Sequence, residues 1–427
     1  MAGPPPDIPG QKMTGDDLWA LRHQVAGLLN RSNTNFPGAQ PVSFAARHML
    51  ELQKQDYFVC EKSDGIRCLM YLTTDPGNME EATFLIDRKN EYYHVQGLHF
   101  PKSAEREKAA AFHTDTIFDG ELVNDIINDP ISGPKPQLMY LVFDCLVLNG
   151  DRLMHQTLDK RIAKFRDIVF NPYEMLYNET FKEEKQYLPF LVDWKRMERG
   201  YGIEHMFKQT LPQLPHGNDG LIFTCRTSPY QFGTDQHILK WKSAEENSID
   251  FRMTLEFPLV EPDSDDEDQS PYTDYSAIPH VNLAIYGGDR GGDIPYGNMF
   301  VDVGKWEELK ALNEPLNDRI VECSLIEGNI WRFMRFRDDK REANHVSTVE
   351  SVMESIQDKV SEEDLIRASK AIKDEWKKRE KETIEKQKVA MARPAVNGQI
   401  DQVRNGSVGM KRKLEGNDET ARGTDGV

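Results

Sequence analysis

The sequence predicts an α+β protein with two folded domains, and three observations lead to this. The chain has 427 residues, 38% of them hydrophobic, so it exceeds the size at which a single core usually keeps growing. Between residues 57 and 225, short strand-like runs alternate with helical segments. Between residues 248 and 337, strand signals separated by turns predominate. We therefore expect a mixed first domain followed by a small antiparallel barrel.

The first domain is predicted to cover residues 14–245, after a Pro-rich, polar N-terminus of residues 1–13 that we expect to be disordered. Helical spacing predicts a helix over residues 16–30, and Ser43 is a plausible N-cap for a second helix over residues 43–53. A third predicted helix covers residues 157–169. Strands are predicted at residues 58–60, 68–72, 83–86, 92–95, 138–143 and 221–224.

The second domain is predicted over residues 246–345, with strands at residues 251–257, 281–286, 320–326 and 330–337. No helix signal follows the glycine-rich run at residues 287–292, so this run is expected to be a barrel turn. An acidic insertion at residues 261–270 has no apolar residue and is interpreted as a solvated loop. A regulatory or partner-binding role is the alternative, with Ser264 as a possible phosphorylation site.

The C-terminal part is dense in Lys and Glu and predicts a charged helix over residues 346–388. Its first turns carry an apolar stripe that we expect to dock, whereas the rest is expected to extend into solvent. Residues 389–427 are predicted to be a disordered tail. Within the tail, Lys411, Arg412 and Lys413 form a short nuclear-import candidate, although such a triplet also occurs by accident in polar tails.

Composition narrows the function classes. Lys and Arg total 53 against 71 for Asp and Glu, a net charge of −18, so any contact with nucleic acid is expected to be local. The five cysteines form no C-x-x-C pair, which argues against a zinc site or a disulfide framework and indicates a reducing compartment. The longest apolar stretch, residues 138–148, is about half a membrane span, so we expect no membrane partner.

The most informative segment is K-S-D-G-I-R at residues 62–67, directly after a strand-like run. A lysine amine attacks an electrophile only when it is neutral, and its usual pKa keeps it charged. Arg67 would supply a fixed positive charge that lowers the pKa of Lys62, and partial burial would act in the same direction. Alone, the segment fits equally well a surface strand that is closed by an Asp-Gly turn.

Five further motifs follow in order: F-D-G-E-L-V at residues 118–123, Y-L-V-F-D at 140–144, D-G-L-I at 219–222, L-K-W-K at 239–242 and R-F-R-D-D-K at 335–340. With the first motif, they make the chain resemble the lysine-dependent covalent nucleotidyltransferases, the superfamily of mRNA guanylyltransferases and polynucleotide ligases. The resemblance covers residues 40–345. It implies an ATP-grasp-like, antiparallel-sheet nucleotidyltransferase domain and a C-terminal OB-fold.

The resemblance also implies a reaction, in which a nucleoside monophosphate passes from an NTP to a lysine amine and then to an acceptor 5′ end. Lys62 would be the nucleophile. Lys240 and Lys242 would contact the α-phosphate, since residues two apart on a strand point to one side while Trp241 packs on the other. A solvated strand face is the alternative for these lysines.

Four more side chains are expected around the nucleotide. By resemblance, Glu121 and Arg67 would bind the ribose hydroxyls, and Arg88 would contact sugar or phosphate. Phe143 would stack on the base, although an aromatic residue in so apolar a strand is often only core. Asp144 beside it is harder to explain as core.

Charged groups for the metal and the outer phosphates complete the expected site. Mg²⁺ or Mn²⁺ would be held by Asp250 and Asp219, although Asp219 also suits a plain turn. Arg337, Asp339 and Lys340 would reach the β- and γ-phosphates when the barrel closes over the nucleotide. The alternative for this last group is a basic RNA-binding patch.

Three functions remain to be separated. Similarity to the stand-alone, fungal-type guanylyltransferase, the α subunit of the capping enzyme, is clearest at residues 87–93, 241–251 and 331–340. It implies transfer of GMP from GTP through a lysine–GMP link to 5′-diphosphate RNA, a separate RNA 5′-triphosphatase subunit, the phosphorylated C-terminal domain of RNA polymerase II as a partner, and a nuclear location. An ATP-dependent polynucleotide ligase and a noncatalytic scaffold are the alternatives, and the residues alone do not determine the choice of base.

Overall fold

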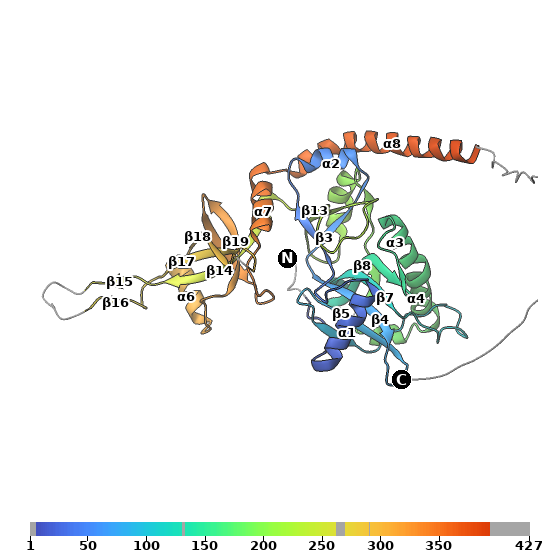
Figure 1. Ribbon diagram of the computed structural model, residues 1–427, viewed down its shortest axis with the longest axis horizontal. Coiled ribbons are helices and arrows are strands. Elements are labelled where there is room, and N and C mark those ends of the chain that lie inside the picture. The colour runs from blue at the N-terminus through green and yellow to red at the C-terminus, as the bar shows by residue number, and fades with distance from the viewer. Residues whose placement is uncertain (1–5, 130–132, 262–269, 290, 393–427) are drawn as a thin grey trace, which may run out of the picture. The chain divides into compact units, whose positions relative to one another are not determined.

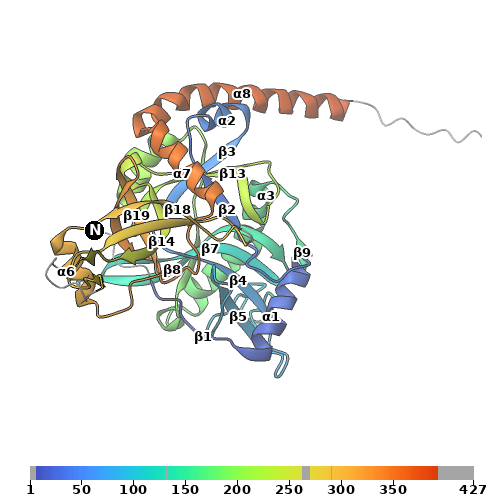
Figure 2. The same cartoon turned by 60° about the vertical axis from the view of Figure 1, so that its left-hand side comes forward.

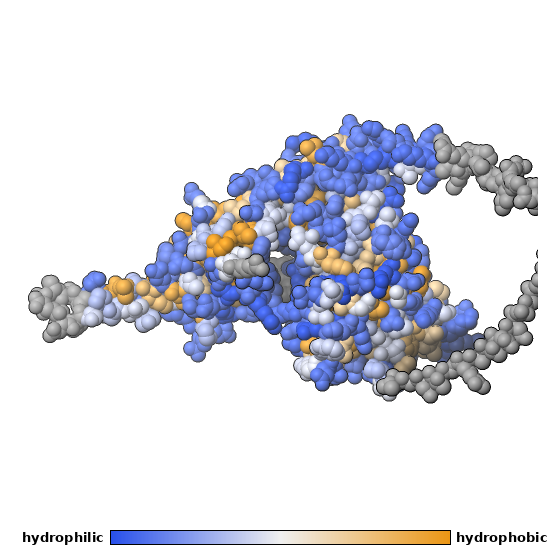
Figure 3. Space-filling model, in the orientation of Figure 1, coloured by the Kyte–Doolittle hydropathy of each residue, from blue (hydrophilic) through white to orange (hydrophobic). Residues whose placement is uncertain are grey.

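A computed structural model describes residues 6–129, 133–261, 270–289 and 291–392 of the chain (Figure 1). Contacts divide the chain into one unit of residues Met1–Lys378 and a second of Arg379–Val427. The first unit contains both sheets and the barrel described below. Polar residues predominate on the surface seen in Figure 3, as expected for a chain of which 29% is charged. No helix in the described part of the chain combines the length and the hydropathy needed to cross a bilayer.

The first sheet-forming region comprises β1 (Gln11–Lys12), α1 (Gly15–Leu28), β2 (Ala39–Ser43), α2 (His48–Lys54), β3 (Tyr57–Ser63), β4 (Ile66–Thr74), β5 (Glu81–Ile86), β6 (Tyr92–Val95), β7 (Thr116–Asp129), β8 (Gly133–Leu148) and β9 (Asp151–Arg152). It continues with α3 (Leu158–Lys164), η1 (Phe165–Phe170), α4 (Asn171–Met175), η2 (Leu176–Thr180), η3 (Glu184–Tyr187), β10 (Leu191–Trp194), β11 (Glu198–Arg199), α5 (Ile203–His205), η4 (Met206–Thr210), η5 (Leu211–Gln213), β12 (Asn218–Cys225), β13 (Gly233–Trp241) and η6 (Ala244–Glu246).

These strands build two sheets, which confirms the predicted α+β class. An 8-stranded sheet has the order β1-β6-β5-β4-β7-β8-β10, with β9 paired to β8. A 5-stranded sheet has the order β11-β3-β12-β13-β2. Pairing is antiparallel except at β10 with β8 and β13 with β2. The sheets are therefore mostly antiparallel, as the resemblance implied.

The chain passes from one sheet to the other within two residues, Asp64 and Gly65. β3, which carries Lys62, lies in the 5-stranded sheet, whereas β4 begins at Ile66 in the 8-stranded sheet. The Asp-Gly pair is therefore a crossing between sheets, and the alternative of a turn that closes a surface strand is wrong. A Cβ atom on Gly65 would lie 2.2 Å from the Leu122 carbonyl oxygen, so the crossing requires glycine.

The second region is a closed barrel of strands β14-β17-β18-β20-β19, which confirms the predicted small barrel. Its elements are β14 (Ser248–Glu256), β15 (Leu259–Val260), β16 (Tyr272–Thr273), β17 (His280–Tyr286), β18 (Asp293–Phe300), α6 (Val303–Ala311), β19 (Ile320–Glu327) and β20 (Ile330–Phe336). Sequence patterns missed β18, which contains Pro295 and Gly297. Gly297 is needed because a Cβ there would meet the Asn329 carbonyl oxygen at 2.6 Å.

Two segments of the barrel bear on earlier expectations. The glycine-rich run connects β17 to β18, and the Gly287 amide donates to the Gly292 carbonyl, so it is a turn as predicted. The acidic insertion falls between the short paired strands β15 and β16, and its residues 262–269 lie outside the described residues.

The N-terminal expectations need correction in two places. Residues 6–13 were expected to be disordered, but β1 pairs with β6 and Ile8 packs against the core of the large sheet. The proposed N-cap at Ser43 is also wrong, because Ser43 ends β2 and α2 begins only at His48. Pairing of Ser43 with Lys240 of β13 overrides the local helix-start signal.

The single C-terminal helix that was predicted is two helices, α7 (Val346–Asp358) and α8 (Glu362–Ala392). The break follows Lys359, whose φ of 47° is left-handed and ends α7. Docking also continues further than predicted, because Leu365 and Ile372 of α8 are buried in the core of the 5-stranded sheet. Trp376 of α8 is buried as well, with its ring edge-on to Phe58 and Tyr201. Residues 393–427, including the basic triplet, lie outside the described residues.

Candidate active site

A cavity of about 720 Å³ lies between the two sheets and the end of β20. Its volume falls within the range of small-molecule sites. Every predicted site residue lines it: Lys62, Arg67, Arg88, Glu121, Phe143, Asp219, Lys240, Lys242, Asp250, Arg337, Asp339 and Lys340. Residues that are far apart in the sequence thus meet in one place, although their individual roles stay predictions.

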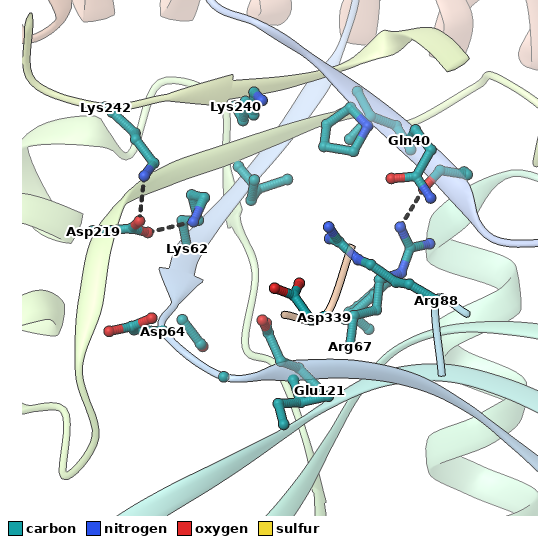
Figure 4. A pocket seen from close by; sticks show the side chains of 18 of the residues that line it. Gln40, Lys62, Asp64, Arg67, Arg88, Glu121, Asp219, Lys240, Lys242 and Asp339 are labelled. Atoms are coloured by element: carbon teal, nitrogen blue, oxygen red, sulfur yellow. Dashed lines mark hydrogen bonds and ion pairs between the residues drawn. The ribbon is translucent and has the colours of Figure 1, made fainter. Parts of the chain in front are cut away.

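One carboxylate holds two lysines on one side of the cavity (Figure 4). Lys62 Nζ donates to Asp219 Oδ1 at 2.5 Å, and Lys242 Nζ lies 2.6 Å from Asp219 Oδ2. An irregularity in the pairing of β12 with β3 falls at Asp219 and Gly220, where Gly220 has a φ of +133°. This irregularity turns the Asp219 carboxylate toward the lysines.

The surroundings of Lys62 favour its neutral form. Burial lowers the pKa of Lys62 most; Asp219 opposes the shift and the charge of Lys242 adds to it. The expected effect of burial is confirmed, but the lowering that was assigned to Arg67 is wrong, because the Asp119 carboxylate neutralises the Arg67 guanidinium. Burial disfavours ionisation of Asp219, but Lys62 and Lys242 outweigh it and lower the pKa of that carboxyl group.

Lys240 adds a further positive charge beside Lys62 and Lys242. Lys240 and Lys242 both line the cavity, whereas Trp241 between them is buried in the core, as the strand alternation predicted. Burial, together with the charges of Lys242 and Lys62, lowers the pKa of Lys240 to about 8. In the described part of the chain, neither Lys240 nor Arg88 forms an ion pair with a carboxylate. The part of the cavity formed by Lys62, Lys240, Lys242 and Asp219 therefore holds a local surplus of positive charge, which suits an anionic ligand, although acids and bases balance over the whole lining.

On the other side of the cavity, Arg67 is committed to protein partners (Figure 4). Its Nε and Nη2 atoms donate to Asp119 at 3.0 and 2.6 Å, and its Nη1 atom donates to the Ala39 carbonyl. Tyr230 also donates to Asp119, at 2.6 Å. The guanidinium of Arg67 also faces the aromatic wall of the cavity, because its central carbon lies 5.4 Å from the centre of the Phe143 ring.

Sequence reasoning missed Lys195, which follows the short strand β10. Its Nζ atom lies 2.8 Å from Glu121 Oε2 and 3.9 Å from Glu61 Oε1. Burial works against its charge, but Glu121 and Glu61 outweigh it and raise the pKa of Lys195. The ammonium also lies 5.7 Å from the centre of the Phe143 ring, so that this ring contacts two cations. No periodic sequence pattern identifies Lys195 as a site residue. The one available signal was its position directly after the end of a strand.

Asp144 is explained by its partner. Arg161 donates to both of its oxygens at 2.7 Å, and both side chains are buried. Asp144 is thus half of a structural ion pair at the wall of the cavity.

The last motif, residues 335–340, lines the cavity from the side of the barrel. Asp250 Oδ1 accepts from Arg337 Nη1 at 3.1 Å, and Lys340 pairs with the other oxygen of Asp250. Arg337 also donates to Asp339, and these bonds lower the pKa of Asp339 to about 2. Lys89 Nζ donates to the Asp338 carbonyl at 3.1 Å, which ties the barrel to the first region.

The two predicted metal ligands differ in how well they suit a cation. Among the described residues, no group of three or more His, Cys, Asp or Glu side chains could form a metal cage. Mg²⁺ commonly needs only one or two carboxylates, with the remaining ligands from phosphate and water. Asp219 is 25% exposed to the cavity and fits that mode, whereas Asp250 is only 6% exposed and is enclosed by Arg337 and Lys340.

A strand-borne lysine of lowered pKa, beside unpaired cations in a nucleotide-sized cavity, is the site of a nucleotidyltransferase. Two family models together match most of the chain: "mRNA capping enzyme, catalytic domain" over residues 5–244 and "mRNA capping enzyme, C-terminal domain" over residues 246–366. The chain belongs to the mRNA capping enzyme family. It is an mRNA cap guanylyltransferase, which uses GTP as its substrate, and the predicted class of enzyme is thereby confirmed.

Curated relatives agree along nearly their whole length. The mRNA-capping enzyme subunit alpha of Neurospora crassa is 48% identical over 388 residues, covering 88% of this chain and 95% of the relative. The protein of the same name from Schizosaccharomyces pombe is 46% identical, covering 90% and 92%. A solved mycobacterial DNA ligase D is 15% identical with a TM-score of 0.32, covering 71% of this chain and 95% of the ligase, which is too low to bear on function.

Proposed function

We propose that this guanylyltransferase works through a covalent link between GMP and Lys62, and that the acceptor is the 5′-diphosphate end of RNA. The observation that supports this is the placement of Lys62. Its amine lies in the cavity with a lowered pKa, bonded to Asp219 and close to cations that lack carboxylate partners. A lysine that served only structure would need neither the lowered pKa nor the surplus charge around it.

In the first step, the neutral Lys62 amine attacks the α-phosphorus of GTP. The N–P bond forms while the bond from phosphorus to the bridging oxygen breaks, and pyrophosphate leaves with that electron pair. The attacking nitrogen gives up a proton, and Asp219 is its hydrogen-bond acceptor at 2.5 Å. Lys240 and Lys242 stabilise the negative charge that develops on the phosphate oxygens.

In the second step, a terminal oxygen of the RNA 5′-diphosphate attacks the same phosphorus. The N–P bond breaks, and the Lys62 amine recovers its proton and is free for another cycle. Because Lys62 is both nucleophile and leaving group, its pKa must lie close to the working pH. Burial and the charge of Lys242 lower the pKa of Lys62 toward that range, and Asp219 opposes the shift.

The other cavity residues are assigned to the nucleotide. Phe143 offers a ring for the base, and Glu121 is assigned to the ribose. Arg67 joins Glu121 there only if it gives up a bond to Asp119 or to the Ala39 carbonyl. Arg88 is open to the cavity and is assigned to phosphate. Mg²⁺ or Mn²⁺ would be held by Asp219 and the nucleotide phosphates, where it would neutralise charge, with Asp250 as a further ligand if its cations move away.

Arg337, Asp339 and Lys340 are assigned to the β- and γ-phosphates. In the structure their charges are engaged by Asp250 and by one another. Phosphate oxygens are equivalent acceptors for these cations, so a bound nucleotide can exchange with Asp250. Departure of pyrophosphate would then restore the protein pairs.

We propose the partners and the location by analogy with the family. The relatives are named as subunit alpha, which supports the proposal that an RNA 5′-triphosphatase acts as a separate subunit. We also propose that the enzyme works in the nucleus and follows the phosphorylated C-terminal domain of RNA polymerase II. Association with transcribing polymerase would bring it to nascent RNA ends.

The test is covalent labelling of the full chain with α-labelled GTP and Mg²⁺. We expect one labelled peptide, containing Lys62, and no label from α-labelled ATP. Lys62→Ala should abolish the label, whereas Lys208→Ala, which removes an exposed lysine paired with Glu204, should leave it unchanged. Label that persists in the folded Lys62→Ala variant would show that another residue is the nucleophile.

A further inference from the structure

The helix α7 packs on both regions of the first unit at once. Val349 and Val352 are buried in the barrel core. On another side of the helix, Ser351 Oγ accepts from the Ser43 amide at 3.3 Å, and Asp358 Oδ2 accepts from the Ala46 amide at 2.6 Å. The helix contacts β2 and also the barrel strands β14 and β17. Figure 1 shows α7 beside the barrel, and Figure 2 shows it close to β2. Because β2 pairs with β13, the helix is joined to the strand that carries Lys240.

Trp241 makes a second, more direct connection to the same helices. It is the last residue of β13, lies between Lys240 and Lys242, and is 6% exposed. Its ring nitrogen donates to the Val360 carbonyl at 2.9 Å, and its ring meets Phe207 edge-on with centroids 5.3 Å apart. Val360 lies in the break between α7 and α8, and Leu365 at the start of α8 is fully buried.

The register of β13 shows why this bond matters. Pairing with β12 ends at Trp241, opposite Leu221, so that Lys242 lies beyond the last paired residue. The indole bond is therefore the last fixed point of the strand before Lys242. Lys242 in turn shares Asp219 with Lys62.

We propose that Trp241 is a positioning residue for guanylyl transfer: through its bond to Val360, the C-terminal helices hold the end of β13 so that Lys240 and Lys242 face the cavity. This inference rests on the proposed function, because it assumes that these lysines serve the attack by Lys62. Trp241 itself contacts no phosphate.

One measurable effect follows. A looser strand end would place Lys240 and Lys242 less accurately, so the rate of Lys62–GMP formation at saturating GTP should fall more than the affinity for GTP. A merely structural role would instead lower the amount of folded enzyme and leave the rate of each folded molecule unchanged.

The experiment compares Trp241→Phe with Trp306→Phe in the full chain. Each replaces a buried tryptophan with a smaller ring, but the ring nitrogen of Trp306 has no hydrogen-bond partner among the described residues. We expect adduct formation at saturating GTP to slow by about tenfold in Trp241→Phe, the value of one hydrogen bond, with a smaller change in the affinity for GTP. Trp306→Phe should keep the wild-type rate and affinity.

Asp358→Ala provides a second, exposed test that leaves the cores intact and removes the bond to Ala46. It should slow the reaction in the same direction by a smaller factor, and it decides the matter if Trp241→Phe does not fold. A folded Trp241→Phe enzyme with the wild-type rate at saturating GTP would overturn the inference, as would equal slowing in Trp306→Phe. Failure of the proposed function differs, because then the wild-type enzyme itself would form no adduct at Lys62.

Discussion

Two groups of charges lie close together in this enzyme and are balanced differently. At one wall of the cavity, Arg67 pairs with Asp119 and Arg161 with Asp144, each through two bonds and with side chains at most 8% exposed. In the more open part of the cavity, Lys62 and Lys242 share the carboxylate of Asp219, and no carboxylate among the described residues pairs with Lys240. The first group is neutral as a whole, whereas the second is positive.

The difference separates structural from functional charge. A buried pair with complete hydrogen bonding adds little net stability, but it is costly to break. A buried surplus of like charge is unfavourable as it stands and lowers lysine pKa values, as it does for Lys240. Such an arrangement is useful only if a ligand supplies the missing negative charge, which the phosphates of GTP do. The comparison therefore predicts opposite responses to removal of a cation.

The largest effect is expected for the balanced group. Arg67→Ala leaves Asp119, which is fully buried, without its guanidinium, so the free energy of unfolding should fall by about 3–5 kcal/mol. Urea denaturation measures this change. Arg166→Ala, which removes an exposed pair with Asp167, is the control and should cost less than about 1 kcal/mol. Equal losses in the two variants would contradict the structural role of Arg67.

For the surplus group, stability and activity should separate. Lys240→Met removes an unbalanced charge, so the free energy of unfolding should stay constant or increase. The rate of Lys62–GMP formation should nevertheless fall by about 10²–10³-fold, because the charge acts on the developing transition state. Single-turnover labelling and urea denaturation of one preparation give both values. Loss of stability without loss of rate would place Lys240 among the structural charges.

Much of the fold could be predicted because its signals are local. Alternating apolar residues mark the barrel strands in the sequence. In β13, the position of Trp241 between two lysines predicts which side of the strand faces the core. The failures occur where distant pairing decides the structure. Ser43 has the chemistry of a helix cap but pairs with Lys240, and β18 forms despite Pro295 and Gly297 because its neighbours close the barrel.

The site shows the same division. Motif order identified the cavity residues, because their types and spacing are set by the chemistry. It did not reveal which charges neutralise one another. Arg67 was expected to lower the pKa of Lys62, but Asp119 balances it, and Lys195 was missed although it holds Glu121. Such pairings depend on three-dimensional contacts between strands that the sequence does not place.

The smallest predicted effect concerns the pH dependence of adduct formation. Lys62 must be neutral to attack, so kcat/KM for adduct formation should first rise with pH as this amine loses its proton. Lys240 must be charged to help, and its pKa of about 8 means that it is positive below pH 8 and neutral above it. The profile should therefore turn downward, with roughly half of the Lys240 contribution lost at pH 8.

Lys240→Arg identifies the group responsible, because a guanidinium stays charged throughout this range. We expect the descending limb to disappear in Lys240→Arg while the rising limb, which belongs to Lys62, stays in place. Single-turnover labelling from pH 6 to 10 at subsaturating GTP would show both limbs. A wild-type profile that rises without a turn would mean that the charge of Lys240 is not needed, and the surplus in the cavity would then have to act through Lys242 and Arg88.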